Sequence, residues 1–527
     1  MPTRRHLLAA AAAATATLAA PAARAQRAPV LRFVPHANLT SLDPVWTTAW
    51  ITRYHGYAVY DTLYSIGADL VPKPQMCAGH VVEDDGKRWV FTLRDGLLFH
   101  DNTPVLARDC VPSIRRWARR DSFGSTMMQA VASLAALDDR RFEFRLHKPF
   151  PLLIDAMAKL APVFVMPERL AGTDPFTAIT DATGSGPFRF RRDEWVPGSR
   201  AVYEKFAGYR PRQEAPDLLG GGKQVKFDRL EWHIMPDPGT AAAALQSGEV
   251  DWWENPPNDL LPPLRRNRGV SIAELDPFGY VTVLRPNHLH PPFDNPALRR
   301  AIWPALSQTD VMTAVNGTDS SLWTDRMGFF TPGTPLASDA GLERLTAPRD
   351  IEAGRRLVAA SGYKGEKIVL LMASDNPAQL ASGAVIFDML QKLGLNAELI
   401  STDWGTVVQR RASREPLEKG GWSLFMSNIT GADTLNPASN HVMRSSGLEG
   451  TWFGWPSSAR LEALRTAWFE APDLATQQRI CRETQEQAFE DTPYWPLGHY
   501  RQPAAFRREL TGLVRAPVPL AWGVGRG

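Results

Sequence analysis

Alternating apolar and polar residues mark two strands in the first third of the chain. In residues 89–93 and 142–146 every second side chain is apolar, a period that is typical of half-buried strands. The stretches 108–120 and 127–134 between them show a helical pattern. We therefore expect a small α+β unit over residues of about 60–180.

Further along the chain, strand, helix and strand follow one another in two separate places. The first set covers residues 230–234, 239–246 and 250–253, and the second covers residues 368–372, 386–393 and 397–400. Gly248 and Gly394 are placed to end the two helices. Such units in both halves predict two α/β lobes, each with a largely parallel sheet.

An extended run, residues 280–287, separates the two sets. After it, Asn295 stands before Pro296 and is placed to cap a helix over residues 297–302. We place the boundary between the lobes at this crossing. The expected division is residues 26–283 for the first lobe with its inserted unit, 284–493 for the second lobe, and 494–527 for a return segment that packs on the first lobe.

The N-terminus has the form of a secretory signal peptide. Arg4 and Arg5 precede an alanine-rich run over residues 7–23, and a small-x-small site ends at Ala25. A membrane anchor needs about 20 strongly apolar residues, and Pro21 and two threonines break this run. The paired arginines resemble a twin-arginine export signal, with the general secretory route as the alternative. No cysteine lies near the cleavage site, so a lipid anchor is not expected.

Charge and composition narrow the classes of partner. The chain of 527 residues is 44% hydrophobic and 22% charged, which is typical of a soluble globular protein. Residues 1–25 contain three arginines, so removing them lowers the 59 basic residues to 56, equal to the 56 acidic ones. A neutral mature chain lacks the basic face that nucleic-acid binding usually needs.

Motifs for catalysis or for a bound cofactor are missing from the sequence. Ser185 lies between two glycines, but the spacing fits a tight turn and not a nucleophile elbow. His288 and His290 could bind a metal ion, yet no third ligand stands beside them, so neither a metal nor a cofactor is expected. Three cysteines are too few for a disulfide framework; one pair could form a disulfide, or all three could remain free thiols: Cys77, Cys110 and Cys481.

Tryptophan is abundant, with 17 residues, and aromatic walls suit a cleft for a small organic solute. Most of these rings must serve in packing. Open α/β sheets bind ligands beyond the ends of their strands. We therefore expect a cleft between the lobes, with the following candidate ligand-binding residues: Trp46, Tyr280, Trp404, Trp422, Asn428, Asp433 and Trp495.

Several segments, in order along the chain, together resemble family 5 extracellular solute-binding proteins, the dipeptide, oligopeptide and nickel group of ABC importers. The matching segments are residues 42–44, 59–63, 89–101, 184–188, 241–252, 292–302, 403–405 and 431–433. The resemblance implies a type II periplasmic binding protein of the large, three-domain form, with hinge strands between its lobes. It also implies a monomer in the periplasm that is no enzyme and that delivers a solute to an ABC permease.

The resemblance leaves the solute open. In dipeptide binders an acidic residue in the loop that holds Asp433 receives the peptide ammonium, although an aspartate there could also cap its own turn. The family's arginine for the peptide carboxylate is missing from the stretch Asn376–Gln379. The resemblance therefore implies a peptide-like or amine-bearing solute. The alternatives are an exported hydrolase, or a binding protein that serves in sensing or as a chaperone.

Export leads to a testable expectation. If residues 1–25 are a signal peptide, the protein recovered from the periplasm begins at Gln26. Intact-mass spectrometry of that fraction measures this directly. Recovery of periplasmic protein that retains Met1 would contradict the assignment.

Overall fold

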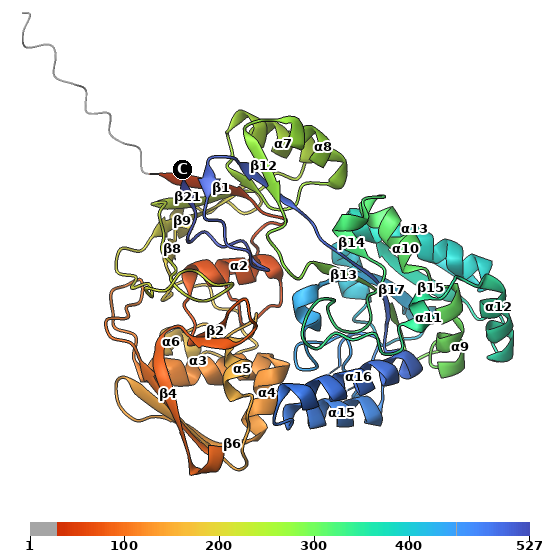
Figure 1. The fold of residues 1–527 in the computed structure, drawn as a ribbon, viewed down its shortest axis with the longest axis horizontal. Helices are drawn as coiled ribbons and strands as arrows, with labels where there is room; N and C mark the ends of the chain where they lie inside the picture. Colours follow the sequence, from red (N-terminus) through yellow and green to blue (C-terminus); the bar gives the residue numbers. More distant parts are fainter. Residues whose placement is uncertain (1–28, 449–450) are drawn as a thin grey trace, which may run out of the picture.

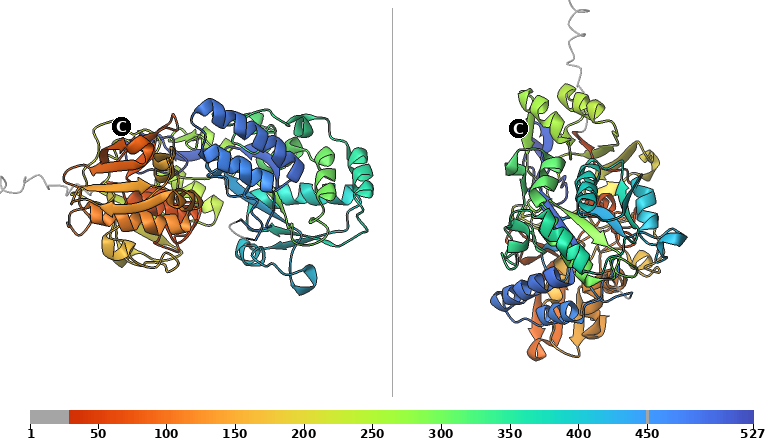
Figure 2. Two further views of the ribbon diagram at one scale, coloured as in Figure 1. Left: turned by 90° about the horizontal axis from the view of Figure 1, so that it is seen from below. Right: turned by 90° about the vertical axis from the view of Figure 1, so that its right-hand side faces the viewer.

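The computed structural model describes residues 29–448 and 451–527, which form two mixed α/β lobes side by side (Figures 1 and 2). The expected signal peptide lies outside the described residues. Each lobe contains one large sheet, and a smaller sheet extends the first lobe. No helix in the described part of the chain combines the length and apolarity that a membrane crossing needs.

A seven-stranded sheet forms the first lobe. Its order is β12 (Val270–Ala273), β19 (Ala504–Arg507), β11 (Trp252–Trp253), β1 (Val30–Val34), β10 (Arg229–His233), β9 (Arg200–Lys205) and β8 (Phe188–Phe190). Only the pairs of β1 with β10 and β11 are parallel. The expected largely parallel sheet is therefore wrong, because the β8–β9 hairpin and the returning chain add antiparallel strands.

The second lobe is built on a six-stranded sheet that is also mixed. Its order is β14 (Trp323–Thr324), β18 (Trp495–Tyr500), β13 (Tyr280–Pro286), β17 (Leu424–Thr430), β15 (Ile368–Ala373) and β16 (Ala397–Thr402). β15 is parallel to β16 and β17, whereas β13 is antiparallel to both of its neighbours. The predicted strand–helix–strand unit is confirmed as β15, α13 (Pro377–Lys392) and β16.

The inserted part of the first lobe has a four-stranded antiparallel sheet. Its order is β4 (Cys77–Glu83), β5 (Arg88–Leu93), β7 (Arg141–Leu146) and β6 (Val131–Ala136). The two predicted strands are confirmed as β5 and β7. The helix expected over residues 127–134 is wrong, because α4 (Ser122–Gln129) ends early and β6 pairs with β7.

Helices pack against these sheets (Figure 1). In the first lobe they are α2 (Trp50–Val59), α3 (Ala107–Arg120), α5 (Leu153–Ala158), α6 (Glu168–Ala171), α7 (Pro238–Ser247) and α8 (Leu261–Arg266). In the second lobe they are α9 (Pro296–Ala301), α10 (Gln308–Asn316), α11 (Glu343–Thr346), α12 (Ile351–Ala360), α14 (Trp404–Arg410), α15 (Ala459–Phe469) and α16 (Leu474–Asp491). Asn295 caps α9 as predicted, and Gly248 ends α7 with a φ of +81°.

The chain passes between the two large sheets twice. β12 belongs to the first sheet and β13 to the second, so the first crossing covers residues 274–279. β18 and β19 place the second crossing at residues 501–503. The expected limits at 283 and 493 are displaced by several residues, because β13 and β18 are both inner strands of the six-stranded sheet.

The lobes also meet away from the crossings. Phe123 of α4 lies 5.2 Å from Phe469 of α15 between ring centres, and Phe150 lies 6.1 Å from the same ring. Lys148 forms an ion pair with Glu470 at 2.8 Å beside them. Figure 1 shows α15 against α4 at this contact. An apolar contact therefore closes the side of the molecule opposite to the crossings.

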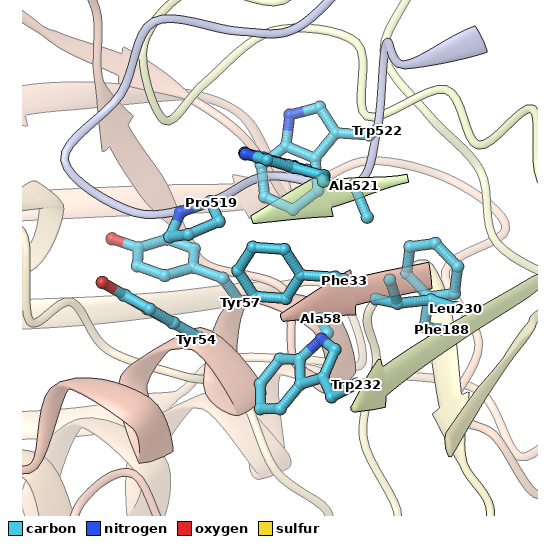
Figure 3. Close-up of a pocket in the computed structure, with 11 residues that line it drawn as sticks. Phe33, Tyr54, Tyr57, Ala58, Phe188, Leu230, Trp232, Pro519, Ala521 and Trp522 are labelled. Carbon is cyan, nitrogen blue, oxygen red and sulfur yellow. The ribbon is translucent and has the colours of Figure 1, made fainter. Parts of the chain in front are cut away.

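The C-terminal residues fill the core of the first lobe. Pro519, Ala521 and Trp522 pack over Phe33 of β1 and line a small cavity with residues of α2 (Figure 3). The cavity volume is about 20 Å³, which is room for about one water molecule. This cavity is therefore too small to hold a solute.

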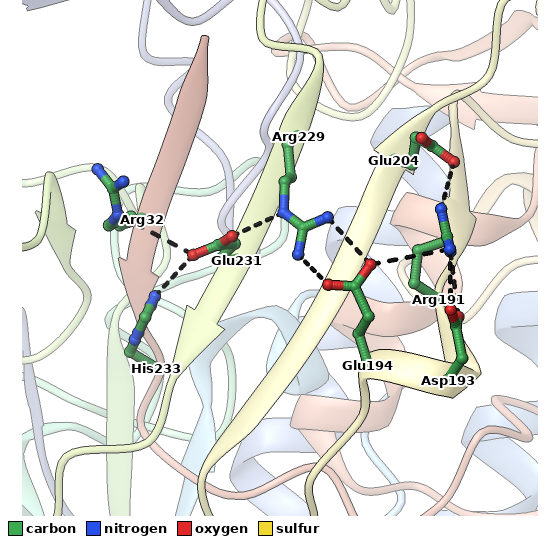
Figure 4. Close-up of polar contacts among 8 residues, drawn as sticks. All are labelled: Arg32, Arg191, Asp193, Glu194, Glu204, Arg229, Glu231 and His233. Carbon is green, nitrogen blue, oxygen red and sulfur yellow. Dashed lines mark hydrogen bonds and ion pairs between the residues drawn. The ribbon is translucent and has the colours of Figure 1, made fainter. Parts of the chain in front are cut away.

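The outer face of the same sheet carries a ladder of alternating charges across β1, β10 and β9 (Figure 4). Glu231 accepts from Arg229 at 2.6 Å and from His233 at 3.1 Å, and Arg229 also pairs with Glu194. Arg191 continues the ladder to Glu204 and Asp193. Each charge in the ladder has a partner within it.

Arg285 of β13 is a fully buried cation in the centre of the second lobe. Its Nε donates to Phe453 O at 2.6 Å, and its Nη1 donates to Val442 O at 2.6 Å and to Pro493 O at 2.8 Å. None of the described carboxylates forms an ion pair with it. Burial lowers the pKa of Arg285 to about 9, so the group remains charged at neutral pH.

Replacing Arg285 with methionine should lower the free energy of unfolding by about 3–5 kcal/mol, because three buried carbonyls lose a charged donor. Urea denaturation measures this change. Arg479→Met is the control: Arg479 is exposed on α16, pairs with Glu483 one turn away, and should change stability by less than about 0.5 kcal/mol. A loss below about 1 kcal/mol for Arg285→Met would contradict the assigned role.

Candidate solute-binding site

One edge of the six-stranded sheet faces the crossings to the first lobe. The parallel strands β15, β16 and β17 end at this edge, and β13 begins there, since Tyr280 pairs with Thr430 and with Tyr500. Open α/β sheets bind ligands beyond the carboxyl ends of their strands. This edge is therefore the candidate site.

Asp433 lies in the short turn Gly431–Thr434 directly after β17. Threonines hold this turn, since Thr430 Oγ1 accepts from Ala432 N at 3.2 Å and Thr331 Oγ1 lies 2.6 Å from Thr434 Oγ1. The alternative that Asp433 caps its own turn is therefore wrong. Its carboxylate has no hydrogen bond or ion pair to any other described residue, which leaves it free to bind a cationic group.

Arg411 stands at the end of α14 inside a cage of four aromatic rings. Its guanidinium carbon lies 5.0 Å from the ring centre of Trp404, 5.7 Å from Phe425, 5.2 Å from Trp452 and 4.7 Å from Phe453. Cation–π contacts of this kind stabilise a partly desolvated cation. Burial lowers the pKa of Arg411 to about 10, so it stays protonated at neutral pH.

The Arg411 side chain forms no ion pair and no hydrogen bond with any described residue. Its Nε is buried without a partner among them. Guanidinium groups bind carboxylates through paired, charge-assisted hydrogen bonds. Arg411 can therefore receive an anionic group that comes from outside the chain.

An aromatic wall connects Arg411 with Asp433. The ring of Trp452, which lies against Arg411, meets the ring of His441 edge-on at 5.6 Å. Burial lowers the pKa of His441, and the nearby Asp433 carboxylate opposes that change. A cation and an anion, each without a counter-ion among the described residues, are thus connected through the contact between Trp452 and His441.

The first lobe contributes an acidic group near the crossings. Glu254, directly after β11, accepts from Tyr54 Oη at 2.6 Å, from the His36 backbone N at 2.8 Å and pairs with His36 Nδ1 at 3.0 Å. Burial raises the pKa of Asp276, in the first crossing, to about 7. Two backbone N–H groups oppose this rise, and the Glu254 carboxylate adds to it. The ring of Tyr280 stacks on Tyr500 at 5.5 Å.

Four of the seven candidate residues lie at this edge: Tyr280, Trp404, Asn428 and Asp433. Trp422 and Trp495 do not line a cleft. Trp422 is 1% exposed and packs on Phe425, and Trp495 is 0% exposed and packs on Phe293.

Trp46 lies apart from the other candidates, on the surface of the first lobe. It is 39% exposed, and its Nε1 donates to Phe176 O at 3.2 Å. Its neighbours are therefore residues of the first lobe and not the sheet edge of the second.

Sequence reasoning missed Arg411, His441 and Glu254. A charged residue directly after a buried strand was a usable signal for Glu254. Arg411 follows Arg410 and reads as half of an ordinary solvated pair, so its aromatic cage is visible only in three dimensions.

Comparisons with known proteins agree with this architecture. The family model described as "Bacterial extracellular solute-binding proteins, family 5 Middle" matches residues 71–449. A curated relative from Sinorhizobium fredii, "Probable peptide ABC transporter periplasmic-binding protein y4tO", is 38% identical over 92% of both chains. The "Glutathione-binding protein GsiB" of Escherichia coli K12 is 23% identical over 91% of both chains.

Two solved structures show the same fold. One is AgaA in complex with agropinic acid, from A. tumefaciens R10, with a TM-score of 0.79, 20% identity, and coverage of 94% of this chain and 99% of that chain. The other is a dipeptide-binding protein from Pseudoalteromonas sp. SM9913 in complex with Met-Leu, with a TM-score of 0.79, 19% identity, and coverage of 94% and 100%. The predicted two-lobe, three-domain fold is confirmed by these likenesses.

The raised pKa of Asp276 predicts that this residue destabilises the folded protein more at high pH than at low pH. Its folded pKa of about 7 exceeds the unfolded value of about 3.9, so the folded state loses stability as the pH rises from about 4 to about 7. Asp276→Asn removes this cost and should raise the free energy of unfolding by about 2–4 kcal/mol at pH 8, and by less than half as much at pH 5.

Urea denaturation at both pH values tests this expectation. Asp473→Asn is the control, because Asp473 is an exposed cap of α16 whose pKa is lowered by its hydrogen bonds to Thr476. It should bring no gain at pH 8. Equal effects of Asp276→Asn at pH 5 and pH 8 would refute the buried-carboxylate account.

Proposed function

The chain belongs to the bacterial extracellular solute-binding proteins of family 5, and we propose that it captures a peptide or a similar zwitterionic solute between its lobes for delivery to an ABC permease. The observation that carries this proposal is the pair of uncompensated charges at the edge of the second lobe. Asp433 would receive the solute's ammonium group and Arg411 its carboxylate. The wall of Trp452 and His441 would contact the part between them.

The names of the similar proteins support a peptide-like solute. They refer to peptides, to glutathione and to the dipeptide Met-Leu, and one refers to agropinic acid. Arg411 could replace the arginine that is missing at Asn376–Gln379, because it places a cation for the solute carboxylate on a different element. The family and these relatives are binding proteins, which favours this function over an exported hydrolase.

The proposal includes the setting of the protein. Residues 1–25 would direct export, through the twin-arginine route or the general secretory route, and the mature protein would act as a monomer in the periplasm. It would need neither a cofactor nor a nucleic acid, and it would not be an enzyme. Native mass spectrometry of freshly purified protein would reveal a co-purified solute and its mass.

Neutralising either charge should weaken binding without unfolding the protein. A charge-assisted hydrogen bond contributes about 1.5–3 kcal/mol, so Asp433→Asn and Arg411→Gln should each lower the affinity about 10- to 150-fold. Titration calorimetry with the co-purified solute, or with tripeptides as probes, measures this loss.

Arg410→Gln is the matched control, because the neighbouring guanidinium donates to Gly420 O and Gly421 O and does not enter the cage. Its affinity should stay within about threefold of the unmodified protein. Affinity changes below threefold in both Asp433→Asn and Arg411→Gln would remove the charge pair from the binding site.

A further inference from the structure

A group of uncharged polar side chains lies buried between the sheet and α13 in the second lobe. Thr282 of β13 and Gln379 of α13 are 0% and 2% exposed, and Asn428 of β17 is partly buried. Thr282 Oγ1, Gln379 Oε1 and Asn428 Oδ1 are all buried without a hydrogen-bond partner. We propose that these residues form a subsite for a neutral amide or hydroxyl group of the bound solute, an inference that rests on the proposed solute-binding function.

Two of the three side chains lie on the face of the sheet that packs against α13, and the third belongs to the buried side of that helix. Thr282 and Asn428 are direct partners across β13 and β17, so both point to the same side. Asn428 Nδ2 lies 3.5 Å from Asn376 Oδ1, the cap of α13, which shows that this side faces the helix. Gln379 belongs to the buried stripe of α13 that continues at Gly383 and Ile386.

Gln379 is exceptional among the buried glutamines of this lobe. Gln308 donates to Met327 O at 2.7 Å and to Pro496 O at 2.8 Å, and it accepts from Met327 N at 3.0 Å. Gln485 is bonded as fully. Gln379 has no side-chain hydrogen bond to any described residue. Buried polar groups are nearly always paired, so an amide held in this state fits a group that arrives with the solute.

The chemistry of the subsite selects a neutral partner. Two carbonyl oxygens, one hydroxyl and one amide NH₂ can both accept and donate, which matches a primary amide or a hydroxyl group. None of the three residues carries a charge that could balance a buried ion. The N-terminal end of α13, a helix of 16 residues, disfavours a cation at this point. An apolar side chain would leave the polar atoms unpaired and be rejected.

The subsite lies near Asp433, on the opposite face of the sheet from the Phe425 ring that Arg411 contacts. Asn428 stands two residues before the end of β17, and Asp433 follows that strand. A solute held by Asp433 beyond the strand ends would therefore extend a polar side chain toward α13. Thr282, Gln379 and Asn428 would then be the residues that determine side-chain specificity.

Melting of the ligand-free protein tests the inference without knowledge of the solute. Gln379→Met and Thr282→Val replace unpaired polar groups by apolar groups of similar size, and each should raise the melting temperature by about 2–4 °C. Gln308→Met is the matched control and should lower it by at least about 5 °C, because it breaks three hydrogen bonds. If Gln379→Met lowers the melting temperature as Gln308→Met does, the amide is structural and the proposal is overturned.

Affinity provides the second measurement. Tripeptides of alanine with a single glutamine at each position are compared by calorimetry with the same peptides that contain methionine. The unmodified protein and Gln308→Met should favour the best glutamine peptide at least 10-fold, and Gln379→Met should reduce this ratio below about threefold. An unchanged ratio in Gln379→Met overturns the proposal. If no tripeptide binds the unmodified protein, the peptide assignment fails, and the melting data alone decide on the subsite.

Discussion

The second lobe depends on a buried guanidinium that has no carboxylate partner in the described part of the chain. Arg285 donates to carbonyls of Val442 and Phe453, which follow β17, and of Pro493, which precedes β18. Backbone carbonyls are weaker counter-groups than a carboxylate, so the cation needs all of them at once. The loops that carry His441 and Trp452 are thereby fixed against β13. The position of the aromatic wall in the candidate site therefore depends on the buried hydrogen bonds of Arg285.

The two lobes treat buried charge differently, and the difference agrees with their roles. In the first lobe Arg116 pairs with Asp43, and Lys223 pairs with Asp61, both fully buried. At the edge of the second lobe, Arg411 is desolvated by aromatic rings and has no such pair among the residues that the structure describes. A neutralised ion pair fixes a scaffold, whereas a charge with neither a counter-ion nor a hydrogen bond keeps its capacity to bind. This difference supports the proposal that the first lobe provides a rigid frame and the second most of the recognition.

Local sequence patterns predicted most helices and strands correctly. The features that they missed depend on contacts between residues that are distant in the sequence. Asn295 and Gly248 set the ends of their helices through interactions within a few residues, so the sequence around them was sufficient. The strand β6 was read as helix because its pairing with β7 is not a local property. Trp422 was assigned to the cleft because tryptophan suits both cores and ligand walls, and only its neighbours separate the two. The cage around Arg411 joins three distant segments, which no spacing in the sequence reveals.

The aromatic contact between α4 and α15 affects how much binding free energy a solute must supply to close the lobes. Rotation of the lobes about the two crossings would separate Phe123 and Phe150 from Phe469 and expose apolar surface to water. The closed arrangement thus has a favourable term that is independent of any ligand. The solute needs to supply only the remaining free-energy difference between the open and closed states. A weakly bound solute is therefore enough to complete closure. The same contact sets a basal level of closed, empty protein, against which a transport partner must discriminate loaded from unloaded carriers.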